Sequence, residues 1–287
     1  RRGEAGVVVG ARSAIFAPVP RLGLVVVDEE HEPSYKQEES PRYHAREVAL
    51  ERARQAGARV ILGSATPSVE AYHRAARGEF VLLRLTRRVD GRSLPPVTVV
   101  DMRREVAAGN RSIFSRALRE ALSGALARGE QAILFLNRRG YAAFVLCREC
   151  GEVLRCPHCA VSLTLHEPGS SLRCHYCDLA CALPSRCPRC GSRYLRPFGA
   201  GTQRVEEAVR ATFPRARVLR MDLDTTSRRG AHRRLFESFL HGEADVLVGT
   251  QMVAKGLDFP GVTLVGVLAA DLALHWPDFR AAERTFQ

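Results

Sequence analysis

The sequence predicts an α/β protein with two parallel-sheet lobes and a small cysteine-rich insertion in the second lobe. Short runs rich in Val, Ile and Leu alternate with stretches of helical periodicity, which is the pattern of parallel sheets covered by helices. All nine cysteines fall between Cys147 and Cys190, so they interrupt only the second series of strands. At 287 residues the chain is long enough for two domains.

The apolar stretches are no longer than strands. No run approaches the eighteen or so apolar residues that a membrane span requires, so we expect a soluble protein with no membrane partner. The chain opens with Arg1 and Arg2 rather than methionine, and no apolar leader follows. We therefore expect it to be a piece of a longer protein.

The first series of elements begins with a buried strand at Leu24–Val27 and includes a helix that begins near residue 67. The helix is expected to have Thr66 as its cap and Pro67 at its first position, where proline is favoured. The other elements of this series are a helix over 42–55, a strand over 58–62 and a strand over 97–100.

The second series alternates in the same way on both sides of the cysteines. We predict helices over 115–127, 204–213 and 229–240, and strands over 132–136, 218–221, 245–248 and 262–268. In parallel sheets of this kind, functional side chains gather where the strands end.

The charge of the chain favours a polyanionic partner such as nucleic acid. Forty-three basic residues against thirty-one acidic ones give a formal net charge of +12. A generic basic surface, an anionic membrane or an acidic protein would also fit this charge. Lys36 and Lys255 are the only lysines, and all other basic side chains are arginine.

Eight of the nine cysteines form four C-x-x-C pairs, a spacing that predicts two tetrathiolate zinc sites. The outer two pairs are followed by Gly151 and Gly191, whereas the inner two are followed by Ala160 and Asp178. Pairing like with like gives a nested assignment. One zinc takes Cys147, Cys150, Cys187 and Cys190, and the other takes Cys156, Cys159, Cys174 and Cys177.

Three further side chains lie in the same region. Cys181 is left over as a free thiol, while His158 and His175 sit inside C-x-x-C pairs and could replace a thiolate. Structural zinc alone would explain the cluster, because so small an insert has little core of its own.

An acidic segment, Asp28-Glu29-Glu30-His31, follows the first strand, and a turn over 63–68 follows the next. Hydrolysis of a nucleoside triphosphate needs one carboxylate to hold Mg²⁺ and another to activate water, and this segment offers both. Taken alone, the same residues are also compatible with a solvated acidic loop.

Together these motifs resemble superfamily 2 DNA helicases and, among them, the replication restart helicases, over essentially every residue. The eight-cysteine spacing matches the insert of that family, whose zinc pairing is nested. Alanine stands at Ala11 where the family usually has threonine. The matching segments are 9–18 (motif Ib), 28–31 (motif II), 63–68 (motif III), 135–141 (motif IV), 201–207 and 249–256 (motif V).

The resemblance implies two RecA-like helicase lobes, of which the first is partial. The implied domains are 1–86 (C-terminal part of lobe 1), 87–130 (connecting segment), 131–146 (start of lobe 2), 147–197 (binuclear zinc insert) and 198–287 (rest of lobe 2).

The resemblance also implies a role for each motif residue. Asp28 would coordinate Mg²⁺, Glu29 would act as general base, and His31 with Ser64 and Thr66 would couple the nucleotide site to DNA. An aromatic-rich loop lies between motifs II and III, although Pro41 stands where the family often has tryptophan. The implied DNA-binding residues are Arg12, Tyr35, Lys36, Tyr43, Arg138, Arg139, Gln251 and Lys255.

The implied activity is ATP-dependent 3′→5′ DNA unwinding that recognises abandoned replication forks and begins primosome assembly. The implied partners are forked and single-stranded DNA, primosome proteins, single-strand binding protein and the replicative helicase or its loader, in the bacterial cytoplasm at the nucleoid. The alternative is a zinc-containing DNA-binding scaffold without catalysis.

Two parts of a helicase motor have no counterpart in the sequence. The two lysines follow Tyr35 and Ala254, so no G-K-[ST] phosphate loop exists, and the chain stops where motif VI with its arginine finger would begin. We expect that these 287 residues do not hydrolyse ATP by themselves.

Overall fold

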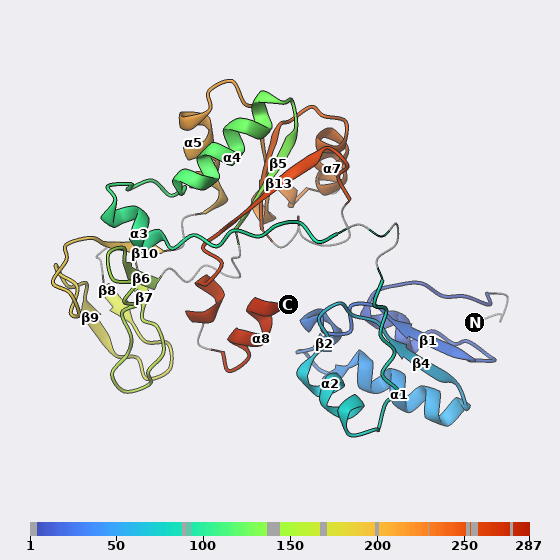
Figure 1. Ribbon diagram of the computed structural model, residues 1–287. Helices are drawn as coiled ribbons and strands as arrows, with labels where there is room; N and C mark the ends of the chain where they lie inside the picture. The colour runs from blue at the N-terminus through green and yellow to red at the C-terminus, as the bar shows by residue number, and fades with distance from the viewer. Residues whose placement is uncertain are drawn as a thin grey trace. The chain divides into compact units, whose positions relative to one another are not determined.

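The computed structural model describes residues 5–87, 91, 93–136, 144–166, 171–198, 201–228, 230–250, 253, 258–275 and 278–287 (Figure 1). The chain divides into two compact units, residues 1–94 with 286–287, and residues 95–285. Four of the predicted DNA-binding residues, Arg138, Arg139, Gln251 and Lys255, lie outside the described residues.

The first unit is built on two parallel strands, β1 (Leu24–Val27) and β4 (Arg59–Leu62). Helix α1 (Ala45–Ala56) connects them and packs on both, because its buried face consists largely of the small residues Ala45, Ala49 and Ala53. Val27 pairs with Leu62, so the two strands end side by side and the loops that follow them meet.

Shorter elements surround this pair. A 3-10 turn, η1 (Arg12–Phe16), precedes β1, and a second one, η2 (Pro33–Tyr35), leads into the hairpin of β2 (Lys36–Gln37) and β3 (Tyr43–His44). Helix α2 (Val69–Ala76) follows β4.

Two predictions for this part of the chain are wrong. Helix α2 begins at Val69 rather than at Pro67, and its cap is Ser68, whose Oγ accepts the N–H of Ala71 at 3.2 Å. Residues 97–100 form no strand, because they pair with no strand among the described residues. The helix predicted over 42–55 begins only at Ala45.

The second unit contains a parallel sheet in the order β11-β12-β5-β13. Its strands are β5 (Gln131–Leu136), β11 (Val218–Met221), β12 (Val246–Gly249) and β13 (Val262–Leu268). The helices predicted from periodicity are α4 (Arg116–Ala127), α5 (Thr202–Thr212) and α7 (Ala231–Leu240).

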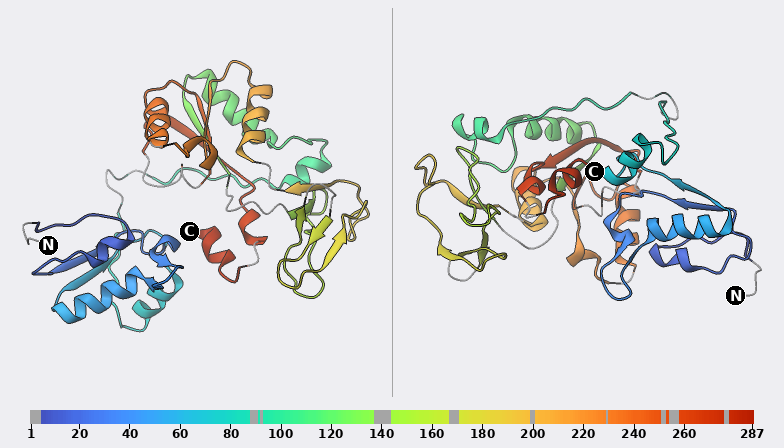
Figure 2. Two further views of the ribbon diagram at one scale, coloured as in Figure 1. Left: turned by 180° about the vertical axis from the view of Figure 1, so that it is seen from behind. Right: turned by 90° about the horizontal axis from the view of Figure 1, so that it is seen from below.

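Alternate residues of the central strands pack on opposite faces of this sheet. Leu134 and Val248 join one core with α4 and α5, whereas Leu247 joins another with Phe239 of α7. Figures 1 and 2 show α4 and α5 on one face of the sheet and α7 on the other. The predicted α/β class, with parallel sheets, is confirmed.

The cysteine-rich region forms a separate antiparallel sheet in the order β10-β6-β7-β8-β9. Its strands are β6 (Phe144–Cys147), β7 (Thr164–His166), β8 (Ser171–Arg173), β9 (Ala180–Ala182) and β10 (Leu195–Phe198). Of the nine residues in its core, four are cysteines. The remaining elements of the unit are α3 (Met102–Ala107), α6 (Leu223–Thr226), η5 (Leu272–His275) and α8 (Ala281–Phe286).

Among the residues that the structure describes, no helix combines the length and the apolar character that crossing a membrane requires.

Candidate active site and zinc centres

The acidic segment and the turn after β4 are joined through their backbones. The N–H of Gly63 donates to the carbonyl of Val27 at 2.9 Å, and the N–H of Glu30 donates to the carbonyl of Gly63 at 3.0 Å. Glu29 has a φ of 47°, in the left-handed region that non-glycine residues rarely adopt. Strained backbone of this kind collects at functional sites, and here it lies at one of the predicted catalytic carboxylates.

His31 connects the two loops through its side chain. Its Nδ1 lies 2.7 Å from the Ser64 Oγ and 3.4 Å from a carboxylate oxygen of Glu29. The Ser64 Oγ also accepts the N–H of Thr66 at 3.0 Å. The structure therefore brings together Glu29, His31, Ser64 and Thr66, four of the five residues predicted for catalysis and coupling.

The fifth residue, Asp28, immediately follows β1. Its Oδ1 accepts the backbone N–H of Glu29 at 3.0 Å, and its carbonyl accepts the hydroxyl of Tyr35 at 2.7 Å. Burial raises the pKa of Tyr35, and the carboxylates of Asp28 and Glu29 raise it further, so this phenol keeps its proton as a hydrogen-bond donor. The first residue of the aromatic-rich loop thus touches the acidic segment directly.

Glu30 belongs to a buried network that the sequence did not reveal. Its carboxylate accepts the N–H of Ser68 at 2.6 Å, the Ser68 hydroxyl at 3.0 Å and an Arg46 N–H at 2.8 Å. Arg46 lies on the alanine face of α1, and a charged residue at such a position is a sequence signal from which a buried partner could have been predicted. Of the three carboxylates in the acidic segment, that of Glu30 therefore has a structural role.

Replacing Glu30 with glutamine is expected to lower the free energy of unfolding by about 3 kcal/mol. Removing the charge of one member of a buried ion pair leaves the other charge poorly compensated, because Arg46 then keeps only the neutral Ser68 hydroxyl and the half-exposed Glu47 as side-chain partners. Urea denaturation of the two proteins measures the change. The matched control is Glu51→Gln on the exposed face of α1, where loss of the solvent-screened pair with Arg54 should leave the urea midpoint nearly unchanged. Equal effects of the two substitutions would contradict the prediction.

Tyr43, at the other end of the aromatic-rich loop, lies next to Arg12 of η1. The Arg12 guanidinium donates to the carbonyls of Ser34 (2.9 Å) and Lys36 (2.7 Å) and lies 6.0 Å from the centre of the Tyr43 ring. Phe16 packs edge-on against Tyr43, with ring centroids 5.0 Å apart. Arg12 and Tyr43 border a hollow of about 490 Å³, while the Lys36 side chain remains exposed.

The eight paired cysteines lie in two groups of four, and the groups are the nested ones that the sequence predicts. Within each group all four sulfurs lie within 4.8 Å of one another. The closest sulfur pairs are Cys147–Cys190 at 3.6 Å, Cys150–Cys187 at 3.7 Å and Cys156–Cys177 at 3.6 Å. Sulfurs bound to one tetrahedral zinc at about 2.3 Å are separated by about 3.8 Å, so both groups fit zinc.

All four C-x-x-C turns have the same backbone. The N–H of the residue after the second cysteine donates to the carbonyl of the first at 2.9 or 3.0 Å in every turn. That residue is left-handed at Gly151 (78°), Ala160 (56°), Asp178 (58°) and Gly191 (73°). The grouping of the cysteines is as expected, but glycine does not distinguish the outer turns from the inner ones, because all four need the same conformation. In the third turn, the N–H groups of Cys177 and Tyr176 lower the pKa of Cys174 to about 7.

The left-handed positions predict opposite effects for two substitutions. Gly191→Ala should lower the free energy of unfolding by about 1 kcal/mol, since an added Cβ meets no atom within 4 Å and only the backbone conformation is penalised. Ala160→Gly should raise it by about 0.5 kcal/mol by removing the same penalty. Urea midpoints of the two variants and the parent test the prediction, and a shift in the same direction for both would contradict it.

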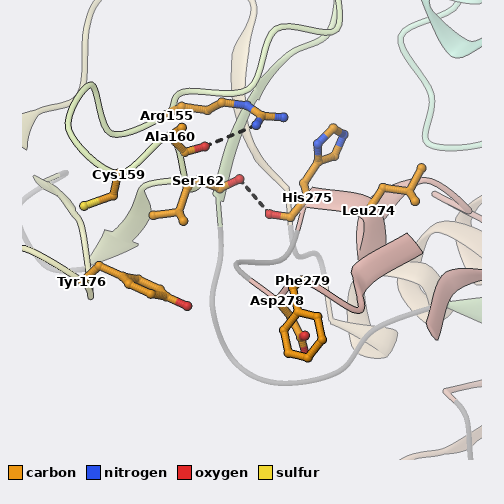
Figure 3. Close-up of a pocket in the computed structure, with 10 residues that line it drawn as sticks. Arg155, Cys159, Ala160, Ser162, Tyr176, Leu274, His275, Asp278 and Phe279 are labelled. Atoms are coloured by element: carbon orange, nitrogen blue, oxygen red, sulfur yellow. Dashed lines mark hydrogen bonds between the residues drawn. The ribbon is translucent and has the colours of Figure 1, made fainter. Parts of the chain in front are cut away.

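The insert also contacts the segment that follows β13. The Ser162 hydroxyl donates to the carbonyl of His275 at 2.8 Å. Within the insert, Arg155 donates to the carbonyl of Ala160 at 3.3 Å. Figure 3 shows these residues around a pocket of about 310 Å³, with Tyr176 on one side and Phe279 on the other. Burial lowers the pKa of His275, so this side chain stays neutral beside the ring of Phe144.

Comparison with known proteins gives a consistent result along the whole chain. Residues 156–181 match the model of the PriA DNA helicase Cys-rich region domain. The chain is 59% identical to the replication restart protein PriA of Bacillus subtilis over all of its own length and 36% of the relative's. It is 53% identical to the PriA of Synechocystis over 99% of the chain and 35% of the relative, and 49% identical to that of Treponema pallidum over 98% and 42%. The chain thus spans less than half the length of these relatives.

Proposed function

Because this chain is homologous over its whole length to a part of the replication restart proteins PriA, we propose that it belongs to an ATP-dependent 3′→5′ DNA helicase that restarts replication at abandoned forks. The observation that supports this proposal most is the 2.7 Å contact between His31 and Ser64. This contact joins the acidic segment to the turn after the neighbouring strand. A displacement of one loop would therefore displace the other. A scaffold that only binds DNA has no need of such a connection.

Two of the three carboxylates in the acidic segment, those of Asp28 and Glu29, lie outside the buried network of Glu30 and are proposed to act on Mg²⁺ and ATP. Glu30 is committed to Arg46 and Ser68, whereas the Glu29 side chain is 54% exposed and Asp28 makes only a short-range bond to the next N–H. Carboxylates are the protein ligands that Mg²⁺ prefers, and this ion neutralises charge on the phosphates during hydrolysis. In this proposal Asp28 holds the ion, and Glu29 takes the proton from the attacking water.

The aromatic-rich loop is the proposed contact with single-stranded DNA. Stacking of bases on aromatic rings, with cations beside them, binds a strand without regard to sequence. Tyr43 and Arg12 border one hollow, and Lys36 is exposed next to it. The Tyr35 hydroxyl donates to the backbone carbonyl of Asp28. A change in the conformation of this loop when DNA binds would therefore move the residue whose carboxylate is proposed to hold the ion. Arg138, Arg139, Gln251 and Lys255 remain proposed DNA contacts.

The zinc insert is proposed to present a surface to the proteins that are loaded at the fork, among them primosome proteins, single-strand binding protein and the replicative helicase or its loader. Under this proposal Cys156→Ser impairs protein loading more than DNA-stimulated ATP hydrolysis, since the insert and the acidic segment are built on separate sheets.

The proposal is tested by ATP hydrolysis and strand separation with the complete protein on forked DNA. We expect hydrolysis to rise when DNA is added, and unwinding to start from a strand that the motor follows in the 3′→5′ direction. DNA binding without stimulated hydrolysis would leave a zinc-containing DNA-binding scaffold in its place.

A further inference from the structure

Two histidines of the zinc insert face each other outside both cysteine groups. His166 is the last residue of β7, and His175 lies in the third C-x-x-C turn, two residues after the end of β8, the strand that pairs with β7 (Figure 1). Both side chains are exposed. Their Nε2 atoms are 3.3 Å apart, and their ring centroids are 5.2 Å apart with the ring planes inclined by 58°.

The two Nε2 atoms are within hydrogen-bond distance, at its long end, and their geometry also matches that of two imidazoles on one metal ion. The N–H···O bonds of proteins are most often about 2.9–3.0 Å between heavy atoms. Two imidazole nitrogens bound to one zinc at about 2.0–2.1 Å, at the tetrahedral angle, lie about 3.3 Å apart and place their ring centroids about 5.2 Å apart. Both expected distances agree with those between His166 and His175.

We propose that His166 and His175 form a third metal site, which binds a divalent transition cation such as Zn²⁺ through two imidazole nitrogens. Water completes the coordination in the free protein, because the site is on the surface. Imidazole suits Zn²⁺, Co²⁺, Ni²⁺ and Cu²⁺, whereas the neighbouring tetrathiolate groups are the softer and tighter sites for zinc. The third ion therefore binds after the first two and is exchanged more readily.

The site is built by strand pairing, since the backbones of β7 and β8 are held in register at Leu165–Leu172 and His166–Ser171. His175 directly follows Cys174, which belongs to the inner cysteine group. An ion held between the two histidines therefore ties the end of β7 to the third turn and restrains that turn.

The test is a Co²⁺ titration of the full chain after both cysteine groups have been filled with Zn²⁺, in a buffer that does not bind metals. We expect a third equivalent to bind with visible d–d absorption but without the near-ultraviolet charge-transfer band of thiolate-bound cobalt. That spectrum separates the third site from replacement of zinc in a cysteine group. His166→Ala and His175→Ala should each lose the third equivalent and keep two zinc ions.

The matched control is His158→Ala, which removes the histidine of another C-x-x-C turn and should keep the third equivalent. Three results would overturn the proposal: saturation of the wild type at two ions, a third ion that survives both substitutions, or a third ion with the thiolate band. Titration of accessible thiols in each variant shows whether the cysteine groups are intact, so a loss caused by misfolding is recognised.

Discussion

Replacing Glu29 with glutamine in the complete protein is expected to lower DNA-stimulated ATP hydrolysis by about 10²–10⁴-fold and to leave DNA affinity nearly unchanged. Glutamine has the shape of glutamate but cannot accept the proton of the attacking water. The proposed DNA contacts of Arg12 and Tyr43 lie in other elements, η1 and β3, so they should survive the substitution. Steady-state hydrolysis with and without forked DNA, together with a binding titration, measures both effects.

The matched control for this experiment is Glu51→Gln, which neutralises an exposed glutamate of the same unit on α1, outside the aromatic-rich loop. It should hydrolyse ATP at the parental rate. Wild-type turnover in Glu29→Gln would assign the base to another residue, and an equal loss in the control would indicate an effect of net charge on DNA binding.

Three strands, Leu24–Val27, Val218–Met221 and Val262–Leu268, are found with the expected bounds. The first two end because an aspartate follows, which cannot continue a buried strand without cost, and the third ends before Ala269, which has a left-handed φ of 51°. Residues 97–100 have the same composition and form no strand. A strand needs a neighbour to bond with, and composition does not disclose where that neighbour is.

The start of α2 was missed for a related reason. A Thr-Pro pair is a good helix start by local rules, yet the helix begins after Ser68. Ser68 is held by Glu30, which is 38 residues away in the chain, through both its N–H and its hydroxyl. This long-range contact selects Ser68 as the cap, and it cannot be predicted from the residues around the start of the helix.

The candidate site was predicted better than its supports. The acidic segment and the turn over 63–68 were expected at the same edge of a sheet, and His31 does meet Ser64 there. The cysteine spacing predicted two groups of four, and the nested grouping is found, although the glycines from which it was argued are not what distinguishes the turns. The buried ion pair of Glu30 and Arg46 was not predicted. Glutamate and arginine are mostly exposed in proteins, and the few that are buried are identified only by tertiary packing.

Metal content should be two tightly held zinc ions per chain, and Cys156→Ser should reduce it to about one. Structural zinc contributes about 10–16 kcal/mol in small zinc-finger peptides, and the core of this insert consists otherwise of five aliphatic residues. Loss of the inner zinc should therefore unfold the part of the insert around β7, β8 and β9. Metal analysis after dialysis against a weak chelator and limited proteolysis measure the two effects.

Loss of zinc should leave the four-stranded parallel sheet folded. The four-stranded sheet has its own cores between α4, α5 and α7, none of which contains a cysteine, so chelation of zinc should leave its cooperative unfolding in place. Cys181→Ser is the matched control, because Cys181 is exposed on β9 and belongs to neither group of four. It should keep both zinc ions and resist the protease as the parent does. Two retained zinc ions in Cys156→Ser would contradict the assignment of the inner site, and a zinc lost from Cys181→Ser would give that cysteine a role as a ligand.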